Sequence, residues 1–460
     1  MSAGSLGGNR TATVRDAVRR CADLRSAWAS ATVRQAIGFA CSSALLGLLG
    51  IGTSALLARA LDVDSYASYT FGRQLLVFGA MFSEFGLFLP AARMLARAEP
   101  PERHRITGAV IGLFVPVAVV FGLAVFALSW IVDAIFDVHA GPALRTVSLV
   151  CLGYPLDFVC LQTAQGLGRL LGYSVASVVS RAGFLALIAA LIQSGTHLTP
   201  SGVLLADALF LLTGWVALLA YFRPSFARLR ETTQRMVRGA RDYGFSAYVG
   251  RVLSMGTYHM DTLMLGAGSD PRSFACYMCA TSLAYVIGLP ATGLATALFG
   301  RLARQPRIEP SWIALVSLVS TVSAVALSMA AEPLVRLIYS DEFLMAAGLV
   351  PLLAAAQLLN AVTRPFNTFL AAHGLGPDLR AAAVTLTVSN LVLNLALIPA
   401  FQAAGAAWAS LLALAVNLAV HVVRYRRAVL TGGTTVPATD DARSTAGSET
   451  TPATGQGVAR

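Results

Sequence analysis

The sequence contains no lysine, and all 34 of its basic residues are arginine. A phosphate-binding loop of the Walker A type needs a lysine, so the chain does not hydrolyse ATP through such a loop. Schiff-base catalysis on a lysine amine is excluded for the same reason. Cysteine and histidine are scarce, with six of each, and they form no metal-ligand pattern such as HExxH. The single Cys-x-x-Cys pair, Cys276 and Cys279, is assigned to apolar packing because no second pair accompanies it.

Charged residues are also rare: they make up 12% of the chain, while 56% of the residues are hydrophobic. A soluble domain of ordinary composition carries about 25% charged residues. Here the apolar residues form runs of about 20, the length that crosses a bilayer core of roughly 30 Å. We therefore predict an all-α integral membrane protein. Its twelve expected transmembrane helices lie near residues 37–58, 71–92, 108–131, 144–165, 172–193, 202–222, 246–266, 277–299, 312–332, 346–368, 381–400 and 404–424.

The arginines are distributed unevenly over the loops between these spans. If the spans alternate in direction, most arginines fall in the N-terminal segment, the even-numbered loops and the stretch after the last span. The positive-inside rule then places both termini in the cytoplasm. The net charge of +11 is a topology signal, and nucleic-acid binding is disfavoured because the arginines form no stripe. The odd-numbered loops hold Arg59, Arg145, Arg272 and Arg336.

The two ends of the chain are polar. Residues 1–34 form a basic N-terminal segment, in which apolar residues from Val14 to Trp28 recur at helical spacing among arginines. This pattern fits an amphipathic helix on the inner leaflet, and a solvated tail is the alternative. A cleaved signal peptide is not expected, because the first apolar run is too long for one. Residues 429–460 are rich in Thr, Gly and Ala, and we expect a disordered cytoplasmic tail.

Short matches along the chain indicate an internal repeat. "YASY" at 66–69 matches "FACY" at 274–277, and "QGLG" at 165–168 matches "HGLG" at 373–376, both at an offset of 208. Six spans lie in each copy, so both copies enter the membrane from the same side. Such parallel repeats are typical of transporters with a substrate path between the halves. We expect a six-span N-lobe at 35–222, an arginine-rich cytoplasmic linker at 223–242 and a six-span C-lobe at 243–428.

Ionisable residues inside the expected spans each cost roughly 2.5–3.5 kcal/mol at a helix centre. They must therefore face one another, a cavity or the interface. One interpretation is buried structural pairs; the other is a cavity of fixed positive charge for an anionic head group, because arginine binds phosphate bidentately. The candidate anion ligands are Arg73, Arg181, Arg251 and Arg364.

Four acids accompany these arginines. Glu84, Asp157 and Asp261 are candidates for coupling to a proton or sodium ion, and Glu84 and Asp157 are the more central by sequence. Asp207, like Arg364, falls near a span end and could extend to the interface. No catalytic cluster occurs, and the expected outer loops are short, so we predict a protein that is not an enzyme and has no cofactor.

The stretch "NLVLNLALIPAFQAAGAAWAS" begins at Asn390 and carries a second amide at Asn394. Pro399 and Gly405 favour a tight turn between the last two spans. The stretch resembles a signature of the bacterial polysaccharide flippases, in the superfamily that also holds the MATE multidrug exporters. Gln402 departs from the family pattern, which often has glycine there. The two amides are assigned to helix packing, and lining of the cavity is the alternative.

Other segments share the resemblance, among them "SEFGLFLPAARMLAR" at 83–97 and "LIYSDEFLMAAGLVPLLAA" at 337–355. It implies a MATE-like fold and a flippase of the bacterial cytoplasmic (inner) membrane for O-antigen, capsule or exopolysaccharide synthesis. The implied substrate is a polyprenyl-pyrophosphate-linked oligosaccharide, whose diphosphate the four arginines would hold. Membrane lipids, a polysaccharide polymerase and glycosyltransferases are the implied partners. The alternatives are a MATE-type drug exporter, a cell-wall lipid-precursor flippase and a membrane enzyme of glycan assembly.

Overall fold

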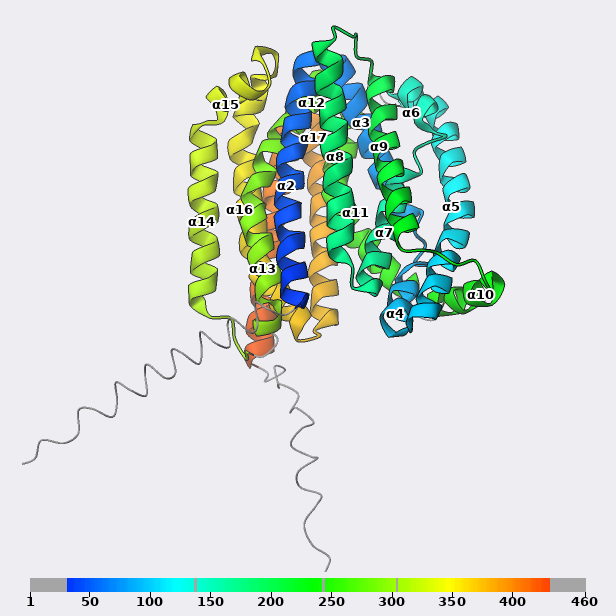
Figure 1. Ribbon diagram of the computed structural model, residues 1–460. Coiled ribbons are helices and arrows are strands. Elements are labelled where there is room, and N and C mark those ends of the chain that lie inside the picture. Colours follow the sequence, from blue (N-terminus) through cyan, green and yellow to red (C-terminus); the bar gives the residue numbers. More distant parts are fainter. Residues whose placement is uncertain (1–30, 136–138, 242–244, 303–304, 431–460) are drawn as a thin grey trace, which may run out of the picture.

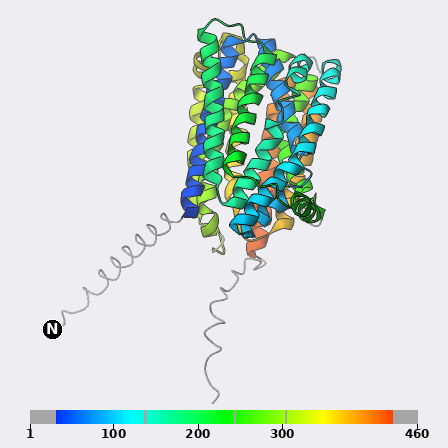
Figure 2. The same cartoon turned by 45° about the vertical axis from the view of Figure 1, so that its right-hand side comes forward.

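A computed structural model describes residues 31–135, 139–241, 245–302 and 305–430. These residues form helices and connecting turns, with no strand among them, so the predicted all-helical class is confirmed. Most helices lie side by side along one common axis, and the described chain begins and ends at the same end of the bundle (Figures 1 and 2). The expected amphipathic helix near the N-terminus and the expected tail beyond residue 430 lie outside the described residues.

The first half of the described chain contains nine helices as far as residue 239. α10 is a short basic helix in the expected linker segment, and it packs against α5 and α4 at the end of the bundle where the chain begins (Figure 1). The bounds are α2 Ala31–Ala60, α3 Val63–Phe82, α4 Leu89–Arg97, α5 Pro100–Ile135, α6 Gly141–Val147, α7 Gly153–Leu167, α8 Leu170–Gln193, α9 Pro200–Tyr221 and α10 Leu229–Gly239.

The second half, from residue 245, continues the bundle. α3 of the first half packs against α11 and α12 of the second, and α2 packs against α13. The bounds are α11 Phe245–Gly268, α12 Pro271–Ala284, α13 Gly288–Leu302, α14 Pro310–Met329, α15 Ala331–Ile338, α16 Met345–Ala372 and α17 Gly376–Leu430, with short 3-10 turns η2 Tyr285–Ile287 and η3 Asp341–Phe343.

Eight helical segments of the described chain are long and apolar enough to cross a bilayer. They include α5, whose large side chains Val120, Leu123 and Trp130 are each about 60% exposed. A soluble protein does not cover a helix face with such residues. Hydrocarbon is therefore the natural solvent of this face, which agrees with a multi-pass membrane protein.

α17 is too long to be one straight helix. Its 55 residues would extend about 80 Å at 1.5 Å per residue, roughly twice the thickness of a bilayer with its head groups. Gln402 has non-helical backbone angles (φ 53°, ψ −129°) and divides it. A Cβ atom on Gly405 would lie only 2.2 Å from the carbonyl oxygen of Leu397, so the chain returns closely on itself here. The break occurs where Pro399 and Gly405 favour a turn.

Two expected spans are interrupted in the structure. The span expected at 71–92 ends as α3 at Phe82, and a turn with positive φ at Phe85 and Gly86 precedes α4. Glu84 therefore lies in this turn and not inside a helix, whereas the sequence places it within a continuous span. The span expected at 144–165 is divided into α6 and α7 by residues 148–152.

One end of the bundle holds α2 and α15 together. The Arg59 guanidinium at the end of α2 donates to the carbonyl oxygens of Ile338 (3.0 Å) and Tyr339 (2.8 Å), and also to that of Leu337. These are carbonyls of the last turn of α15, which have no partner inside their own helix. Below them, the Ser54 and Tyr66 hydroxyls are 2.6 Å apart. The contacts of Arg59 therefore join segments that are 278 or more residues apart in sequence at this end of the bundle.

Candidate functional site

A buried carboxylate binds two arginines inside the first half of the bundle. Asp207 of α9 is fully buried. Its Oδ2 accepts from Arg73 Nε of α3 at 3.2 Å and from the Tyr154 hydroxyl of α7 at 2.7 Å. Its Oδ1 accepts from Arg181 Nη1 of α8. We call these four residues the arginine cluster. It carries two positive charges and one negative charge.

Small residues bring the helices of the arginine cluster together. A Cβ atom on Gly214 of α9 would lie 1.9 Å from the Ser180 hydroxyl oxygen of α8, so the glycine lets the two helices approach closely while Ser180 keeps this rotamer. Arg181 follows Ser180 directly, and the close contact of the two helices puts its side chain within reach of Asp207. The ion pair between Arg181 and Asp207 therefore depends on how α8 and α9 pack and does not follow from the sequence spacing.

The three charged side chains of the arginine cluster differ in exposure. The Asp207 side chain is 1% exposed, while those of Arg73 and Arg181 are 33% and 25% exposed. A guanidinium has five N–H donors, and Asp207 satisfies only part of them. The arginine cluster can therefore offer further donors and a net positive charge to an anion. The prediction that Asp207 extends to the interface is wrong, because the two arginines fix it in the interior.

Asp157, one of the candidate coupling acids, lies on α7 beside this cluster. Its Oδ1 accepts from the Tyr173 hydroxyl of α8 at 2.7 Å. The Tyr173 ring in turn stacks on Trp215 of α9, with 5.0 Å between centroids and 10° between planes. Asp157 is half-buried, and the Tyr173 hydroxyl holds its carboxylate in place.

Asp261, the other helical coupling candidate, lies in the second half of the bundle on α11. Its Oδ2 accepts from the Tyr277 hydroxyl of α12 at 2.6 Å and from the Ser410 hydroxyl of α17 at 2.9 Å. Its Oδ1 accepts from the backbone N–H of Thr262 at 2.8 Å. Asp261 therefore joins three helices, and no arginine is bonded to it among the described side chains.

The remaining candidates are not gathered with the arginine cluster. Arg364 is half-buried on α16, and its Nε has no hydrogen-bond partner among the described residues. Arg251 lies on α11, and its side chain is outside the described part. Glu84 is buried in the turn after α3. The structure thus brings Arg73 and Arg181 together and leaves Arg364 apart.

The two amides of α17 bond to each other. Asn394 Nδ2 donates to Asn390 Oδ1 at 2.9 Å, one helical turn away, and both side chains are buried. The sequence favours a bond from each amide to a neighbouring helix, and no such bond is present among the described residues. Asn394 Oδ1 has no hydrogen-bond partner there either.

Sequence reasoning missed the tyrosines that hold the acids: Tyr154, Tyr173 and Tyr277. A usable signal was present, because a tyrosine hydroxyl inside an apolar span must find a partner. Each lies on a helix that packs against the helix of its acid. Among the described residues, no group of three or more His, Cys, Asp or Glu side chains could hold a metal ion.

Comparisons with known proteins agree with this helical arrangement. A family model described as polysaccharide biosynthesis protein matches residues 33–305. A comparison with curated protein sequences gives no significant match.

Solved membrane transporters share the fold. A structure described as the lipid II flippase MurJ in an inward closed conformation matches with a TM-score of 0.65 and 12% identity, over 84% of this chain and 87% of that chain. The MATE multidrug transporter DinF-BH matches with a TM-score of 0.63 and 15% identity, over 86% and 95%. An inward-facing MATE family transporter of the MOP superfamily matches with a TM-score of 0.62 and 13% identity, over 86% and 96%. The likeness at these identities is one of fold.

Proposed function

The chain belongs to the polysaccharide biosynthesis protein family, a MATE-like family of flippases, and from this premise we propose that it moves lipid-linked oligosaccharide repeat units across the bacterial cytoplasmic membrane. The carrier is a polyprenyl pyrophosphate, and the product serves O-antigen, capsule or exopolysaccharide synthesis. Glycosyltransferases act before this step, and a polysaccharide polymerase acts after it. The protein works by alternating access and performs no covalent chemistry.

The observation that carries the substrate class is the arginine cluster. Two arginines that share one buried carboxylate leave a net positive charge inside an apolar bundle. Such a charge is costly in hydrocarbon unless an anion balances it during the working cycle. A diphosphate supplies that anion, and the guanidinium fork suits its oxygens. Arg251 and Arg364 are proposed as further ligands from the second half.

The proposed topology has twelve spans in two six-span lobes, with both termini in the cytoplasm. A matching pair of helix caps supports the repeat. Asp62 accepts from the N–H of Ser65 at 3.1 Å, and Asp270 accepts from the N–H of Ser273 at 3.0 Å. Both caps begin a helix within an expected outer loop, and their separation of 208 equals the offset of the sequence repeat. In this orientation, the polar contacts of Arg59 close the outer side.

Ion coupling is proposed at Asp157 and Asp261. Each acid is held by a tyrosine hydroxyl and neither is paired with an arginine by a described bond. An acid placed in this way can take up a proton or sodium ion without losing an arginine partner. Glu84 remains a third candidate, although its place in the turn after α3 is less central.

A deletion strain tests the function. Lipid-linked glycans and surface polysaccharide are measured together, with the wild-type gene restored as the control. We expect surface polymer to be lost and single repeat units to accumulate on the inner leaflet. Repeat units that already stand on the outer leaflet would mean that the defect lies after flipping and would refute the proposal.

A MATE-type exporter of cationic compounds is the second candidate. The observation that favours it is that Asp157 and Asp261 are acids without a described arginine partner, which suits a cation as well as a coupling ion. Unchanged surface polymer with heightened sensitivity to cationic dyes in the deletion strain would select this function.

A further inference from the structure

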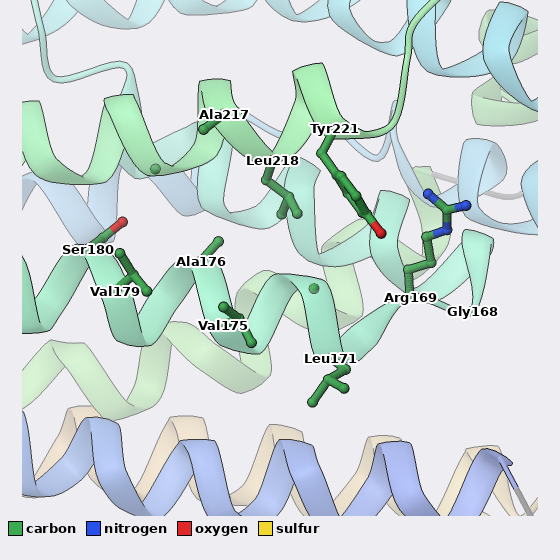
Figure 3. A pocket seen from close by; sticks show the side chains of 12 residues that line it. Gly168, Arg169, Leu171, Val175, Ala176, Val179, Ser180, Ala217, Leu218 and Tyr221 are labelled. Carbon is green, nitrogen blue, oxygen red and sulfur yellow. The ribbon is translucent and has the colours of Figure 1, made fainter.

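An open apolar groove runs between α8 and α9, and its Ser180 end adjoins Arg181 of the arginine cluster. It encloses about 960 Å³, within the range of ligand-binding pockets in general. Figure 3 shows side chains of both helices along it, with Arg169 and Tyr221 at one end and Ser180 at the other. The lining residues are Gly168, Arg169, Leu171, Gly172, Val175, Ala176, Val179, Ser180, Gly214, Ala217, Leu218 and Tyr221.

Small residues create the groove. Gly172 and Ala176 on α8 face Gly214 and Ala217 on α9, where larger side chains would fill the space between the helices. Along its open rim, Leu171, Val175 and Val179 are each more than half exposed. Both helices are candidate membrane spans, so the groove lies in the apolar, membrane-spanning part of the chain.

The groove has one charged residue, and it lies at one end. Arg169 is exposed just before the first turn of α8, and its guanidinium carbon lies 5.3 Å from the centroid of the Tyr221 ring. In the proposed orientation this end lies at the cytoplasmic surface. Arginine and tyrosine are residues that commonly contact lipid head groups at that depth. The charge is therefore placed for an anionic head group of the inner leaflet.

The length of the groove matches one leaflet. Arg169 and Ser180 are eleven positions apart on α8, which corresponds to about 17 Å of helix. Half of a hydrocarbon core is about 15 Å thick. An acyl chain of a phospholipid spans this distance, whereas a polyprenyl chain is longer than a leaflet is thick. The dimensions thus favour an ordinary membrane lipid over the carrier of the substrate.

We propose that the groove between α8 and α9 is a binding site for an anionic phospholipid of the inner leaflet. One acyl chain lies along the small residues, and the phosphate contacts Arg169. The inference rests on the proposed orientation for its leaflet, but binding can be measured without transport. A failure of this proposal is therefore separable from a failure of the flippase function.

The test uses the full-length protein, purified in a neutral detergent, with added phosphatidylglycerol or phosphatidylcholine. Phosphatidylglycerol should raise the melting temperature at least about 2 °C more than phosphatidylcholine does. Arg169→Gln removes the charge and Ala176→Phe fills the groove, and either variant should abolish this difference. The matched controls are Arg97→Gln, an exposed arginine elsewhere, and Val120→Phe on the exposed face of α5; both should retain it.

Native mass spectrometry of the same samples gives a second measurement that does not depend on unfolding. The wild-type protein should retain phosphatidylglycerol, and Arg169→Gln should lose most of it. A preference for phosphatidylglycerol that persists in both groove variants would overturn the proposal. The proposal would also be overturned if polyprenyl monophosphate raised the melting temperature of the wild-type protein but not of Arg169→Gln or Ala176→Phe, and phosphatidylglycerol had no effect.

Discussion

Asp207 illustrates how a single residue decides the properties of this site. Without it, Arg73 and Arg181 would be two like charges in an apolar bundle, and each would pay the cost of its own burial. With it, the arginine cluster keeps one net positive charge and a defined geometry, supported by the Tyr154 hydroxyl. The carboxylate thus acts as a structural counter-charge, and the guanidinium donors that it does not use are the ones we propose for anion binding.

Replacing Asp207 should be strongly destabilising. Asp207→Asn removes the shared partner of two arginines, and breaking a buried ion pair costs about 3–5 kcal/mol. We expect a marked fall in the melting temperature of the purified protein. Asp64→Asn is the control, because Asp64 is exposed and such changes stay within about 0.5 kcal/mol. Equal stability of the two variants would refute the structural role of Asp207.

A substitution of Asp261 should affect ion-driven transport without affecting the stability of the fold. Asp261→Asn retains hydrogen-bond acceptance from Tyr277 and Ser410 but removes the charge. We expect transport driven by an ion gradient to be lost while the melting temperature changes little. Tyr277→Phe is the companion variant, since it leaves the charge and removes one donor. Ion-driven transport that survives in Asp261→Asn would exclude this acid from coupling.

At the scale of single helices, the break in α17 depends on close backbone contact. A Cβ atom at position 405 would lie 2.2 Å from the carbonyl oxygen of Leu397. Gly405→Ala should therefore force a backbone shift and destabilise the protein by about 1–3 kcal/mol. In Gly348→Ala, nothing lies within 4 Å of the new Cβ, so the control should be neutral or slightly stabilising. Thermal unfolding of both variants checks this, and equal effects would contradict the tight turn.

In the proposed orientation, the contact between α2 and α15 should control access from the outer side. Arg59→Gln removes charge-assisted bonds to the last carbonyls of α15, each worth about 1.5–3 kcal/mol. Opening of this end should become roughly tenfold more frequent. The buried Cys279, whose thiol lies 3.7 Å from the Tyr66 hydroxyl, serves as a reporter for labelling from outside, with the other cysteines replaced.

Arg336→Gln is the matched control for this labelling experiment. Arg336 lies at the same end, but its partners Glu332 and Asp341 belong to α15 and the turn after it. Its loss should leave the labelling rate of Cys279 unchanged. An equal rate in Arg59→Gln and wild type would show that Arg59 does not hold this end closed.

At the scale of the whole molecule, composition predicted the class, and the fold comparisons agree with it. Apolar runs and the arginine bias depend on local sequence, so they predict a multi-pass membrane protein without knowledge of packing. Partners across the bundle do not follow from local sequence. Asp207 and Arg73 are 134 residues apart, and their contact depends on how α3 and α9 pack. The sequence did not predict the turn at Glu84 because the residues before and after it are apolar, and the whole stretch 71–92 therefore resembles one continuous span.

The most direct measurement of the central claim is flipping by the purified protein in liposomes. A polyprenyl-diphosphate-linked oligosaccharide is placed in one leaflet, and its appearance in the other is followed by a membrane-impermeant glycan probe. The account predicts flipping by the wild-type protein. It also predicts loss of flipping in Arg73→Gln, which leaves Arg181 and Asp207 as a neutral, folded pair. Flipping that is undiminished in Arg73→Gln and Arg181→Gln, or absent from a wild-type protein that transports cationic dyes, would contradict the account.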